Sequence, residues 1–352
     1  MSKKLLCIIL LLSFALINVN GQIISNREQS AVSGIMTQNE NMKPQDVTNK
    51  PGENAIFMVF GLTSREGVSD KVKDLCGSFT AIVKSMRNRF PDAEVSAVIG
   101  FGTGAWTRLF PGLPRPKELE VFKEIKGAKY TAPSTPGDLF FHIRAKRRDV
   151  CYELAAIISN HLQGAAEHID EVHGFRYFDG RAIIGFVDGT ENPGNDEAYQ
   201  SATIGNEDAF FKGGSYAFVQ KYIHDMDKWN NLSTEEQEKV VGRRKYNDLE
   251  LSDEEKPENA HNAVTNIKDK QGNELKIVRA NMAFANPSKG EFGTYFIGYA
   301  GTFTTTKRML ENMFIGDPVG NTDKLLDFST AYTGTLFFVP TFDLLEKLSE
   351  SE

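Results

Sequence analysis

Three side chains that lie far apart in the sequence, Asp188, His261 and Arg279, have the chemical character of a reactive site. A positioned carboxylate can accept a proton and return it, so one group can serve both directions of a transfer. Imidazole is a common ligand of iron. A guanidinium keeps its positive charge and can stabilise negative charge that develops as a bond breaks. Together these side chains would suit proton transfer beside a bound iron, provided that the fold brings them together.

Asp188 lies in a glycine-rich segment, Gly185-Phe-Val-Asp-Gly-Thr-Glu-Asn-Pro193. Gly185 and Gly189 would let the backbone turn tightly and approach a flat cofactor closely. Continued to Asp196, the same run is also compatible with an ordinary turn or with a loop of oxygen ligands for calcium. The segment by itself therefore leaves three interpretations open.

The segment GFVDGTENP resembles the G-x-x-D-G signature of the dye-decolourising peroxidases, and it matches more than the bare signature requires. The likeness extends from about residue 54 to about residue 342, through residues 279–301 and 313–338. The chain is identified as a member of that family, in its shorter branch. The resemblance implies an enzyme with one haem b per chain that uses hydrogen peroxide to oxidise dyes, phenols and similar small aromatic reductants by one-electron steps. The alternative is a haem-binding protein that carries haem or releases its iron.

The resemblance also implies which residues do the chemistry. His261, in H261-NAVTNI267 followed by V278-RANM282, matches the segment that holds the axial ligand of the haem iron. On the opposite face, Asp188 takes the role of acid and base, and Arg279 that of the fixed charge. Asn281 would point to the same side as Arg279 if this segment is a strand, and could hydrogen-bond peroxide or Asp188. The other histidines have no such context: His142, His161, His168, His173 and His224.

Two further residues are expected to contact the haem, and a carboxylate is expected to hydrogen-bond the histidine that holds its iron. Gly189 would approach the haem, and Arg243 is a weaker candidate for pairing with a propionate, since its neighbours are equally basic. A ligating histidine usually gives its second N–H to an acceptor, and the family places a carboxylate there. Asp323 is the first choice and Asp327 the second, with Asp317 also nearby. A turn residue at the start of a helix explains Asp323 equally well.

Hydrophobic patterning predicts an alternation of strands and helices along the chain. Strands are predicted at residues 55–61, 95–101, 139–143, 215–222, 294–299 and 334–339, an extended segment at 172–184, and helices at 68–90, 150–168, 229–241 and 304–314. Asp149 is the expected N-cap of the second helix, on which His161 and His168 would lie, and Ser233 or Thr234 opens the third. Residues 248–262 are charged and contain proline, and are expected to form a loop that carries His261 into the site.

This order indicates an α+β fold of two duplicated ferredoxin-like halves with antiparallel sheets. The resemblance implies the same duplication, in the manner of a dimeric α/β barrel, with haem between the sheet and the helices of the C-terminal half. Residues 54–200 would form the N-terminal half with the Asp188 loop. Residues 201–345 would form the C-terminal half with His261 and Arg279.

The first 21 residues predict a secretory signal peptide, with Lys3 and Lys4 before an apolar run over residues 5–16. That run is too short to favour a membrane span of about 20 residues, although an uncleaved anchor is an alternative. Residues 22–53 are polar and predict a mobile leader or loosely packed arm. We therefore expect a secreted protein with no membrane contact after cleavage; an endosomal or lysosomal lumen is the alternative.

Charge and cysteine content limit the partners. Loss of two lysines with the signal peptide would change the net charge from −7 to −9. An acidic chain without a basic run argues against nucleic acid and anionic membranes as partners. A homo-oligomer is also expected. Cys76 and Cys151 would remain, either as two buried thiols, which is the favoured interpretation, or as one disulfide. Asn231-Leu-Ser is an acceptor pattern for N-glycosylation.

Overall fold

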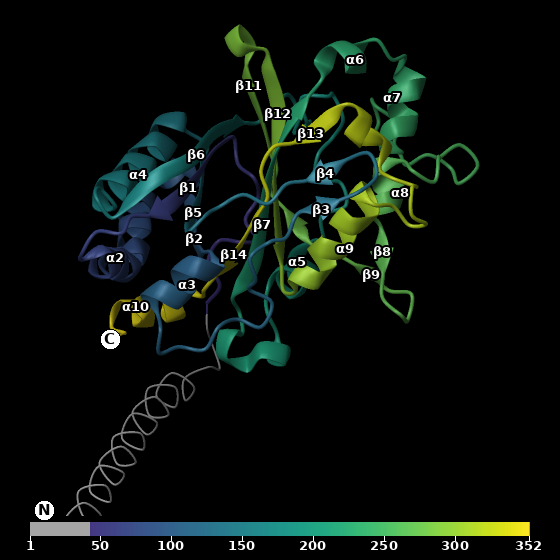
Figure 1. Ribbon diagram of the computed structural model, residues 1–352. Helices are drawn as coiled ribbons and strands as arrows, with labels where there is room; N and C mark the ends of the chain where they lie inside the picture. The colour runs from purple at the N-terminus through teal and green to yellow at the C-terminus, as the bar shows by residue number, and fades with distance from the viewer. Residues whose placement is uncertain (1–42, 352) are drawn as a thin grey trace, which may run out of the picture.

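The first half of the chain folds into a four-stranded antiparallel sheet covered by helices (Figure 1). The structure, a computed structural model, describes residues 43–351, so the predicted signal peptide and leader residues 22–42 lie outside it. The strands lie in the order β6 (Ala166–Phe175), β1 (Asn54–Leu62), β5 (Leu139–Ala145) and β2 (Ser96–Phe101), and the helices are α2 (Val68–Arg89), α3 (Thr103–Leu109) and α4 (Arg148–His161). A short hairpin, β3 (Ile125–Lys126) and β4 (Thr131–Ala132), extends from this half.

The second half repeats this arrangement with two interrupted strands. Around β7 (Ser215–His224) and β12 (Glu291–Ala300), one edge is formed by β10 (Val278–Arg279) and β11 (Met282–Asn286), and the other by β13 (Ser329–Ala331) and β14 (Thr335–Val339). Its helices are α5 (Asn195–Ala202), α6 (Met226–Asn230), α7 (Thr234–Val241), α8 (His261–Thr265), α9 (Phe303–Phe314) and α10 (Phe342–Ser349), with a small hairpin of β8 (Ile267–Lys268) and β9 (Glu274–Leu275). The predicted duplicated α+β fold is confirmed.

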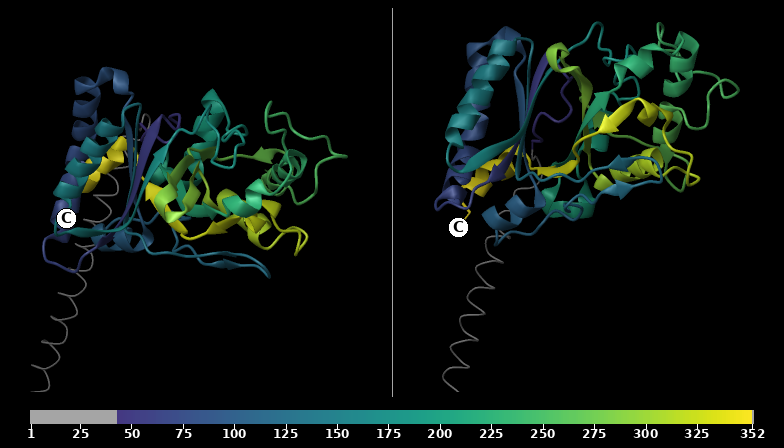
Figure 2. Two further views of the ribbon diagram at one scale, coloured as in Figure 1. Left: turned by 90° about the horizontal axis from the view of Figure 1, so that it is seen from above. Right: turned by 45° about the horizontal axis from the view of Figure 1, so that its top comes forward.

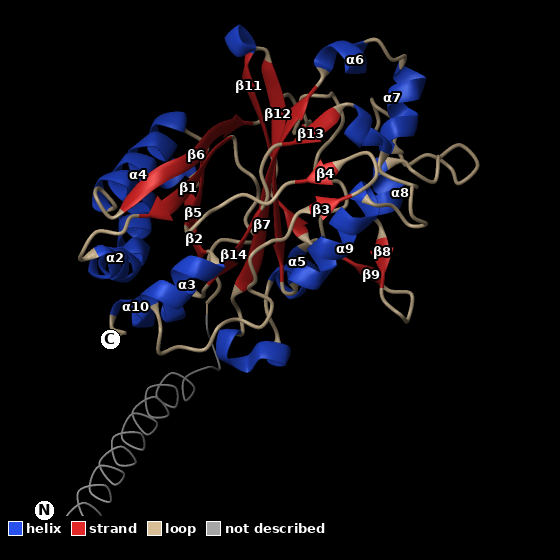
Figure 3. Ribbon diagram, in the orientation of Figure 1, coloured by secondary structure: helices blue, strands red, loops and turns tan. Residues whose placement is uncertain are grey.

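Single bridges join the two sheets at both edges, so that together they enclose a common interior. Phe338 of β14 pairs with Phe101 of β2, and Ala283 of β11 pairs with Phe175 of β6. In Figure 2, α2 and α4 of the first half lie on one side of the strands and α8 and α9 of the second half lie on the other, whereas α10 returns to the side of α2. Figure 3 shows the helices and strands by colour. Each strand therefore has one face towards the shared interior and one towards the helices of its own half.

The alternation of side chains along the strands fills both faces. On β1, Phe57 belongs to the interior cluster, whereas Met58 packs in the cluster beneath α2 and α4. On β12, Tyr295 and Tyr299 belong to the interior, whereas Phe296 packs towards the helices of the second half. Because successive side chains of a strand point to opposite faces, strands that are buried on both sides are apolar almost throughout.

Residues 43–53 are docked onto the fold, so the expectation of a loosely packed arm is wrong for this part of the leader. The Gln45 amide donates hydrogen bonds to the carbonyls of Ile99 (3.0 Å) and Pro340 (2.9 Å) and accepts one from the Ile99 N–H (2.8 Å). Val47 is buried in the interior cluster. Polar composition predicted a mobile segment, but specific pairing with strand backbones compensates for the missing apolar surface.

Several predicted boundaries shift. The helix expected over residues 150–168 ends at His161, and Gly164 adopts a left-handed φ of 81° before β6 begins, so His168 lies on a strand. Asp149 lies in the first turn of α4, after the N-cap Arg147. The extended segment 172–184 keeps strand structure only to residue 175. The helix expected over residues 229–241 is two helices, the second of which begins at the predicted Ser233 with a capping box.

The two remaining cysteines, Cys76 and Cys151, are buried and unpaired, which confirms the interpretation as free thiols. Burial raises the pKa of both thiols, to about 12 for Cys151. Both groups therefore stay in the unreactive thiol form near neutral pH.

Within residues 43–351, no helix has the length and apolar character needed to cross a bilayer.

Candidate active site

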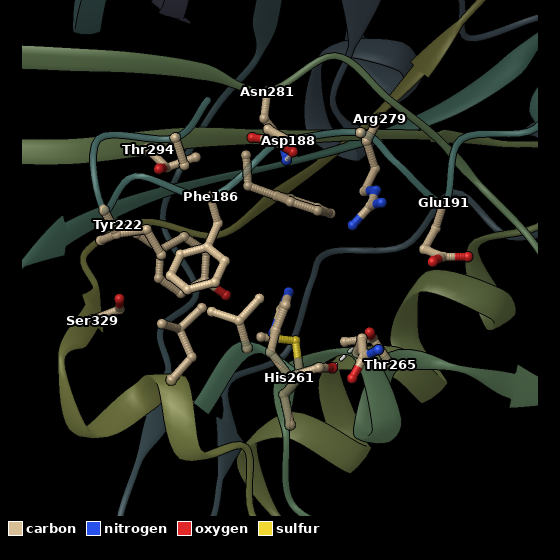
Figure 4. Close-up of a pocket in the computed structure, with 18 of the residues that line it drawn as sticks. Phe186, Asp188, Glu191, Tyr222, His261, Thr265, Arg279, Asn281, Thr294 and Ser329 are labelled. Atoms are coloured by element: carbon tan, nitrogen blue, oxygen red, sulfur yellow. Dashed lines mark hydrogen bonds between the residues drawn. The ribbon is translucent and has the colours of Figure 1, made fainter. Parts of the chain in front are cut away.

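A deep pocket lies between the sheet of the second half and its helices α8 and α9, and the loop of residues 177–194 covers it (Figure 4). Most of its lining is apolar: Ile184, Phe186, Phe296, Leu310, Met313 and Leu326. The side chains predicted to do the chemistry form two opposed groups. In Figure 4, His261 points into the pocket from one side, and Asp188, Arg279 and Asn281 lie on the opposite side. The fold therefore brings together the residues that were far apart in sequence.

His261 opens the short helix α8, and a buried carboxylate holds its ring. The Nδ1 atom of His261 lies 2.6 Å from Oδ2 of Asp323, which is fully buried. The other Asp323 oxygen accepts the Leu325 N–H (2.9 Å) at the start of a short 3₁₀ helix. Asp323 therefore does both things that the sequence left open: it caps a helix and it binds the histidine. With Nδ1 occupied, Nε2 is the nitrogen left to bind an iron atom in the pocket.

The other two aspartates considered for this contact lie elsewhere. Asp327 is bound by Lys129, by the Tyr130 hydroxyl and by Lys324. Asp317 precedes a proline in the turn after α9. Only Asp323 of the three reaches His261.

On the opposite side, the Asp188 carboxylate is fixed through Asn281. The Asn281 amide donates to Asp188 Oδ1 (3.1 Å), and its oxygen accepts the Ile297 N–H of β12 (3.1 Å). Asn281 lies in the break between β10 and β11 rather than within a strand, but it reaches Asp188 as the sequence suggested. The Asp188 N–H donates to the Gly180 carbonyl (3.0 Å), so backbone and side chain are both held.

Asn192, which was not predicted as a site residue, joins the two segments that carry Asp188 and Arg279. Its side chain accepts the Arg279 N–H (2.8 Å) and donates to the Arg279 carbonyl (2.7 Å). This pair of bonds ties the strand that carries Arg279 to the loop that carries Asp188. The guanidinium itself has no hydrogen bond or ion pair among residues 43–351 and points into the pocket (Figure 4). Asn192 lies within the GFVDGTENP match, which was the available signal.

Arg243 lies at the mouth of the pocket between two carboxylates. Its Nη1 atom is 2.6 Å from Glu191, and its Nε atom is 3.0 Å from Asp248, whose second oxygen accepts the Thr190 hydroxyl (2.6 Å). Gly189 lines the same region with a left-handed φ of 83°, a conformation that favours glycine. Because both carboxylates already pair with Arg243, a haem propionate at this end of the pocket would have to share the guanidinium with them.

One further histidine, His224, lines the pocket, and the sequence offered no signal for it. It is buried, with Nδ1 2.7 Å from the Ser329 hydroxyl and Nε2 2.9 Å from the Thr294 hydroxyl. Burial lowers the pKa of His224 to about 4, so the ring is neutral at neutral pH. His142 is bound to Tyr299 in the shared interior, and the remaining histidines do not line the pocket.

The donor set fits haem. Among residues 43–351 no three His, Cys, Asp or Glu side chains lie close enough together to hold a metal ion. Haem iron takes four ligands from the porphyrin and needs a single protein donor such as imidazole. A flat apolar pocket with one oriented histidine meets that requirement.

Comparisons with known proteins agree with this geometry. The family models described as Dyp-type peroxidase, N-terminal and C-terminal, match residues 44–176 and 179–344. The two matched regions meet between residues 176 and 179, before the Asp188 loop. The dye-decolorizing peroxidase of Rhodococcus erythropolis is 52% identical over 303 residues, covering 86% of this chain and 88% of that protein. That of Mycobacterium tuberculosis is 51% identical over 307 residues, covering 87% and 90%.

Solved structures show the same relationship. A dye-decolorizing peroxidase from Bacteroides thetaiotaomicron superposes with a TM-score of 0.85 at 66% identity, covering 88% of this chain and 99% of that one. A DypB variant from Rhodococcus jostii, solved in complex with heme, superposes with a TM-score of 0.84 at 48% identity, covering 87% and 98%. The cofactor is haem, and the reaction is the reduction of hydrogen peroxide at the expense of a reductant. This chain belongs to the Dyp-type peroxidase family and is a haem peroxidase.

Proposed function

We propose that His261 would hold the haem iron and that Asp188, Arg279 and Asn281, on the opposite side of the pocket, would act on peroxide. When bound, haem supplies the iron at which peroxide is reduced and the two oxidising equivalents that reductants then consume one at a time. Asp188 takes the proton from the peroxide oxygen nearer the iron and returns it to the departing oxygen, which leaves as water. Arg279 stabilises the negative charge that develops as the O–O bond breaks.

The other polar residues hold these groups in position. Asn281 donates to Asp188 and leaves the second carboxylate oxygen for the proton transfer. Asp323 fixes the ring of His261 and makes it a stronger donor to iron. Arg243 would share its guanidinium between Glu191, Asp248 and a haem propionate, and Gly189 would allow the loop to approach the porphyrin.

One observation carries this proposal: a histidine oriented by a buried carboxylate lies across one apolar pocket from an acid and an unpaired cation. A protein that only carried haem, or released its iron, would have no need of Asp188 and Arg279 on the open face. The peroxidase assignment is therefore preferred over the carrier.

Phenols and dyes are the proposed reductants, and secretion is the proposed destination. Residues 1–21 support export, and Asn231 is exposed at the end of α6, where a glycan would fit. An endosomal or lysosomal lumen is the alternative destination. We also propose that the protein forms a homo-oligomer, which sizing of the purified protein by light scattering tests.

Absorption spectra of the haem-loaded protein, with and without one equivalent of peroxide, test the proposed roles. The wild type should show the Soret band of a histidine-ligated haem, and this band should shift on addition of peroxide. His261→Ala should lose stable haem or its axial imidazole. His173→Ala, which changes a histidine bound to Glu171 on the surface, is the control and should behave as wild type. An unaltered histidine-ligated spectrum in His261→Ala would show that another residue is the ligand.

A further inference from the structure

A hairpin of the N-terminal half lies against the helix that forms one wall of the haem pocket. Strands β3 and β4 lie beside α9 (Figure 1). The approach is closest at Gly127 in the hairpin, where an added Cβ atom would overlap the carbonyl oxygen of Phe314, the last residue of α9. Because only a residue without a side chain fits at this contact, the hairpin has a defined place beside α9.

The same hairpin binds a carboxylate in the segment that follows α9. The Tyr130 hydroxyl and the Lys129 ammonium group both donate to Oδ1 of Asp327, and Lys324 lies 3.0 Å from its Oδ2. Burial alone would raise the pKa of Asp327, but the bonds from Lys129, Tyr130 and Lys324 lower it to about 2. The carboxylate is therefore ionised at neutral and mildly acidic pH, and it accepts all three bonds.

Of these three partners, Tyr130 is the one that can fix Asp327 to the hairpin. The Lys129 side chain is 62% exposed, so water competes for its ammonium group. Lys324 belongs to the same short 3₁₀ helix as Asp327, residues Lys324–Asp327, and cannot anchor that helix to another part of the fold. The Tyr130 ring is partly buried and packs against the main hydrophobic core. Its hydroxyl is therefore the bond that holds this helix to the N-terminal half.

Asp327 and Asp323 lie at the two ends of this single helical turn. Asp323 is its N-cap and holds the ring of His261. The Lys324 N–H donates to the carbonyl of Asn259 (3.0 Å), two residues before His261. A single 3₁₀ turn has little stability of its own, so contacts with the rest of the fold decide where it lies. A shift of the Asp327 end would therefore change the geometry of the bond between Asp323 and His261.

We propose that Tyr130 is a positioning residue for the haem ligand: its bond to Asp327 holds the 3₁₀ helix where Asp323 accepts a strong hydrogen bond from His261. The strength of that bond determines how strongly the imidazole donates to iron, and hence the reduction potential of the haem. The N-terminal half thereby influences an iron site that is built by the C-terminal half. This inference rests on the proposed roles of His261 and Asp323 and extends them to a residue of the other half.

The test measures the Fe–His stretching frequency of the ferrous haem-loaded protein in resonance Raman spectra, and the midpoint potential of the haem. Asp323→Asn sets the scale: a neutral amide is a weaker acceptor than a carboxylate, so the frequency should fall and the potential should rise. Tyr130→Phe should shift both quantities in the same direction by a smaller amount. Tyr152→Phe removes an exposed hydroxyl on α4 of the same half, and as the matched control it should give wild-type values.

A double variant tests whether Tyr130 acts through Asp327. Asp327→Ala should shift both quantities as Tyr130→Phe does, and the two changes together should add little to Asp327→Ala alone, because they remove one and the same bond. Additive shifts overturn the inference. So do wild-type values in Tyr130→Phe beside shifted values in Asp323→Asn, even if Tyr130→Phe melts at a lower temperature, and that outcome leaves the proposed haem ligand intact. Wild-type values in Asp323→Asn would instead refute the proposed role of Asp323, and this inference with it.

Discussion

At the scale of single residues, Arg279 has a firmly held backbone and a side chain that makes no hydrogen bond or ion pair among residues 43–351. Asn192 holds both backbone groups of Arg279, whereas the guanidinium makes no bond within the described chain. Asp188 is held through its backbone and through one carboxylate oxygen. Groups fixed in this way need little reorganisation when charge develops on a bound molecule, which is the main source of catalysis by preorganised polar groups.

Replacement of either group should slow the reaction with peroxide while haem remains bound. Arg279→Leu removes one preorganised charge, and the expected loss is about 100- to 1000-fold. Asp188→Asn removes the proton acceptor, with an expected loss of roughly 100- to 10,000-fold. Stopped-flow absorbance after mixing with peroxide measures both rates. Arg308→Leu, on the exposed side of α9, is the control and should react as wild type. Wild-type rates in both pocket variants would refute the proposed roles.

At the scale of elements, α9 depends on a residue of the other half. The Thr302 N-cap of this helix provides no side-chain cap of its own. The Glu118 carboxylate instead accepts the Thr304 N–H (2.7 Å) and the hydroxyls of Thr302 and Thr304. A negative group at a helix start satisfies free N–H groups and interacts well with the helix dipole. One wall of the haem pocket is therefore anchored from the N-terminal half.

Loss of this anchor should destabilise the protein. Glu118→Ala leaves the first N–H groups of α9 to water, and the free energy of unfolding should fall by about 1–2 kcal/mol. Glu120→Ala is the matched control because Glu120 makes only an exposed ion pair with Lys307 of the same helix, which is worth less than about 1 kcal/mol. Urea unfolding of the two haem-loaded variants measures the difference. Equal losses would show that Glu118 contributes only surface charge.

His224, which joins β7 to β13, should make the protein less stable as the pH falls from about 6.5 to about 4. Burial lowers the pKa of His224 from 6.5 to about 4. Between these values the unfolded chain binds a proton that the folded chain does not. Stability is therefore lost as the pH falls below about 6.5, and the loss from this residue ends near pH 4, at up to about 3 kcal/mol.

A His224→Gln variant tests this dependence. It should be less stable at neutral pH because hydrogen bonds are lost, but its unfolding free energy should decline less between pH 6.5 and pH 4.5 than that of the wild type. His161→Gln is the control, since its ring lies in a partly exposed pair with Asp74. If the free energy of unfolding fell equally with pH in the wild type and in His224→Gln, His224 would have the same pKa in the folded and the unfolded chain.

At the scale of the whole molecule, each half sends a segment that packs against the other half. The hairpin β3–β4 of the first half lies beside α9 of the second, and the C-terminal α10 returns to pack on α2 (Figure 1). The segment of residues 43–50 bonds to both sheets, through Ile99 of β2 and through Pro340 after β14. These connections make the pocket a property of the complete chain rather than of the second half alone.

Arg144 holds this segment in place from inside the shared interior. It is buried and donates to the carbonyls of Asp46, Asn49 and Lys50. Arg144→Met should leave these carbonyls without their donor and lower the free energy of unfolding by about 3 kcal/mol. Arg147→Met, at an exposed pair with Asp149, should change it by less than about 0.5 kcal/mol. Similar melting temperatures for the two variants would exclude the anchoring role of Arg144.

The family and the main helices and strands could be predicted from the sequence, and His261, Asp188 and Arg279 could be named as candidates, whereas the strands β10, β11 and β13 and the helices α5 and α10 were not predicted. These features depend on local patterns in the sequence. The spacing of apolar residues predicts the helices and strands, and the nine-residue motif at residues 185–193 identifies the loop that carries Asp188. Asp323 could be selected but not separated from Asp327 and Asp317, because all three share one short polar segment. Only the burial of Asp323 against His261 distinguishes it.

Tertiary structure alone decided the contacts that join distant segments. Nothing in the sequence near His224 indicates that Thr294 and Ser329 meet it, because adjacent strands bring together residues 70 and 105 positions apart. The docking of residues 43–53 was hidden for the same reason: their polar composition predicts mobility, and their partners lie on strands of both halves. Local composition determines which elements form, whereas the pairing of strands and the burial of polar groups depend on which distant residues the completed fold places opposite them.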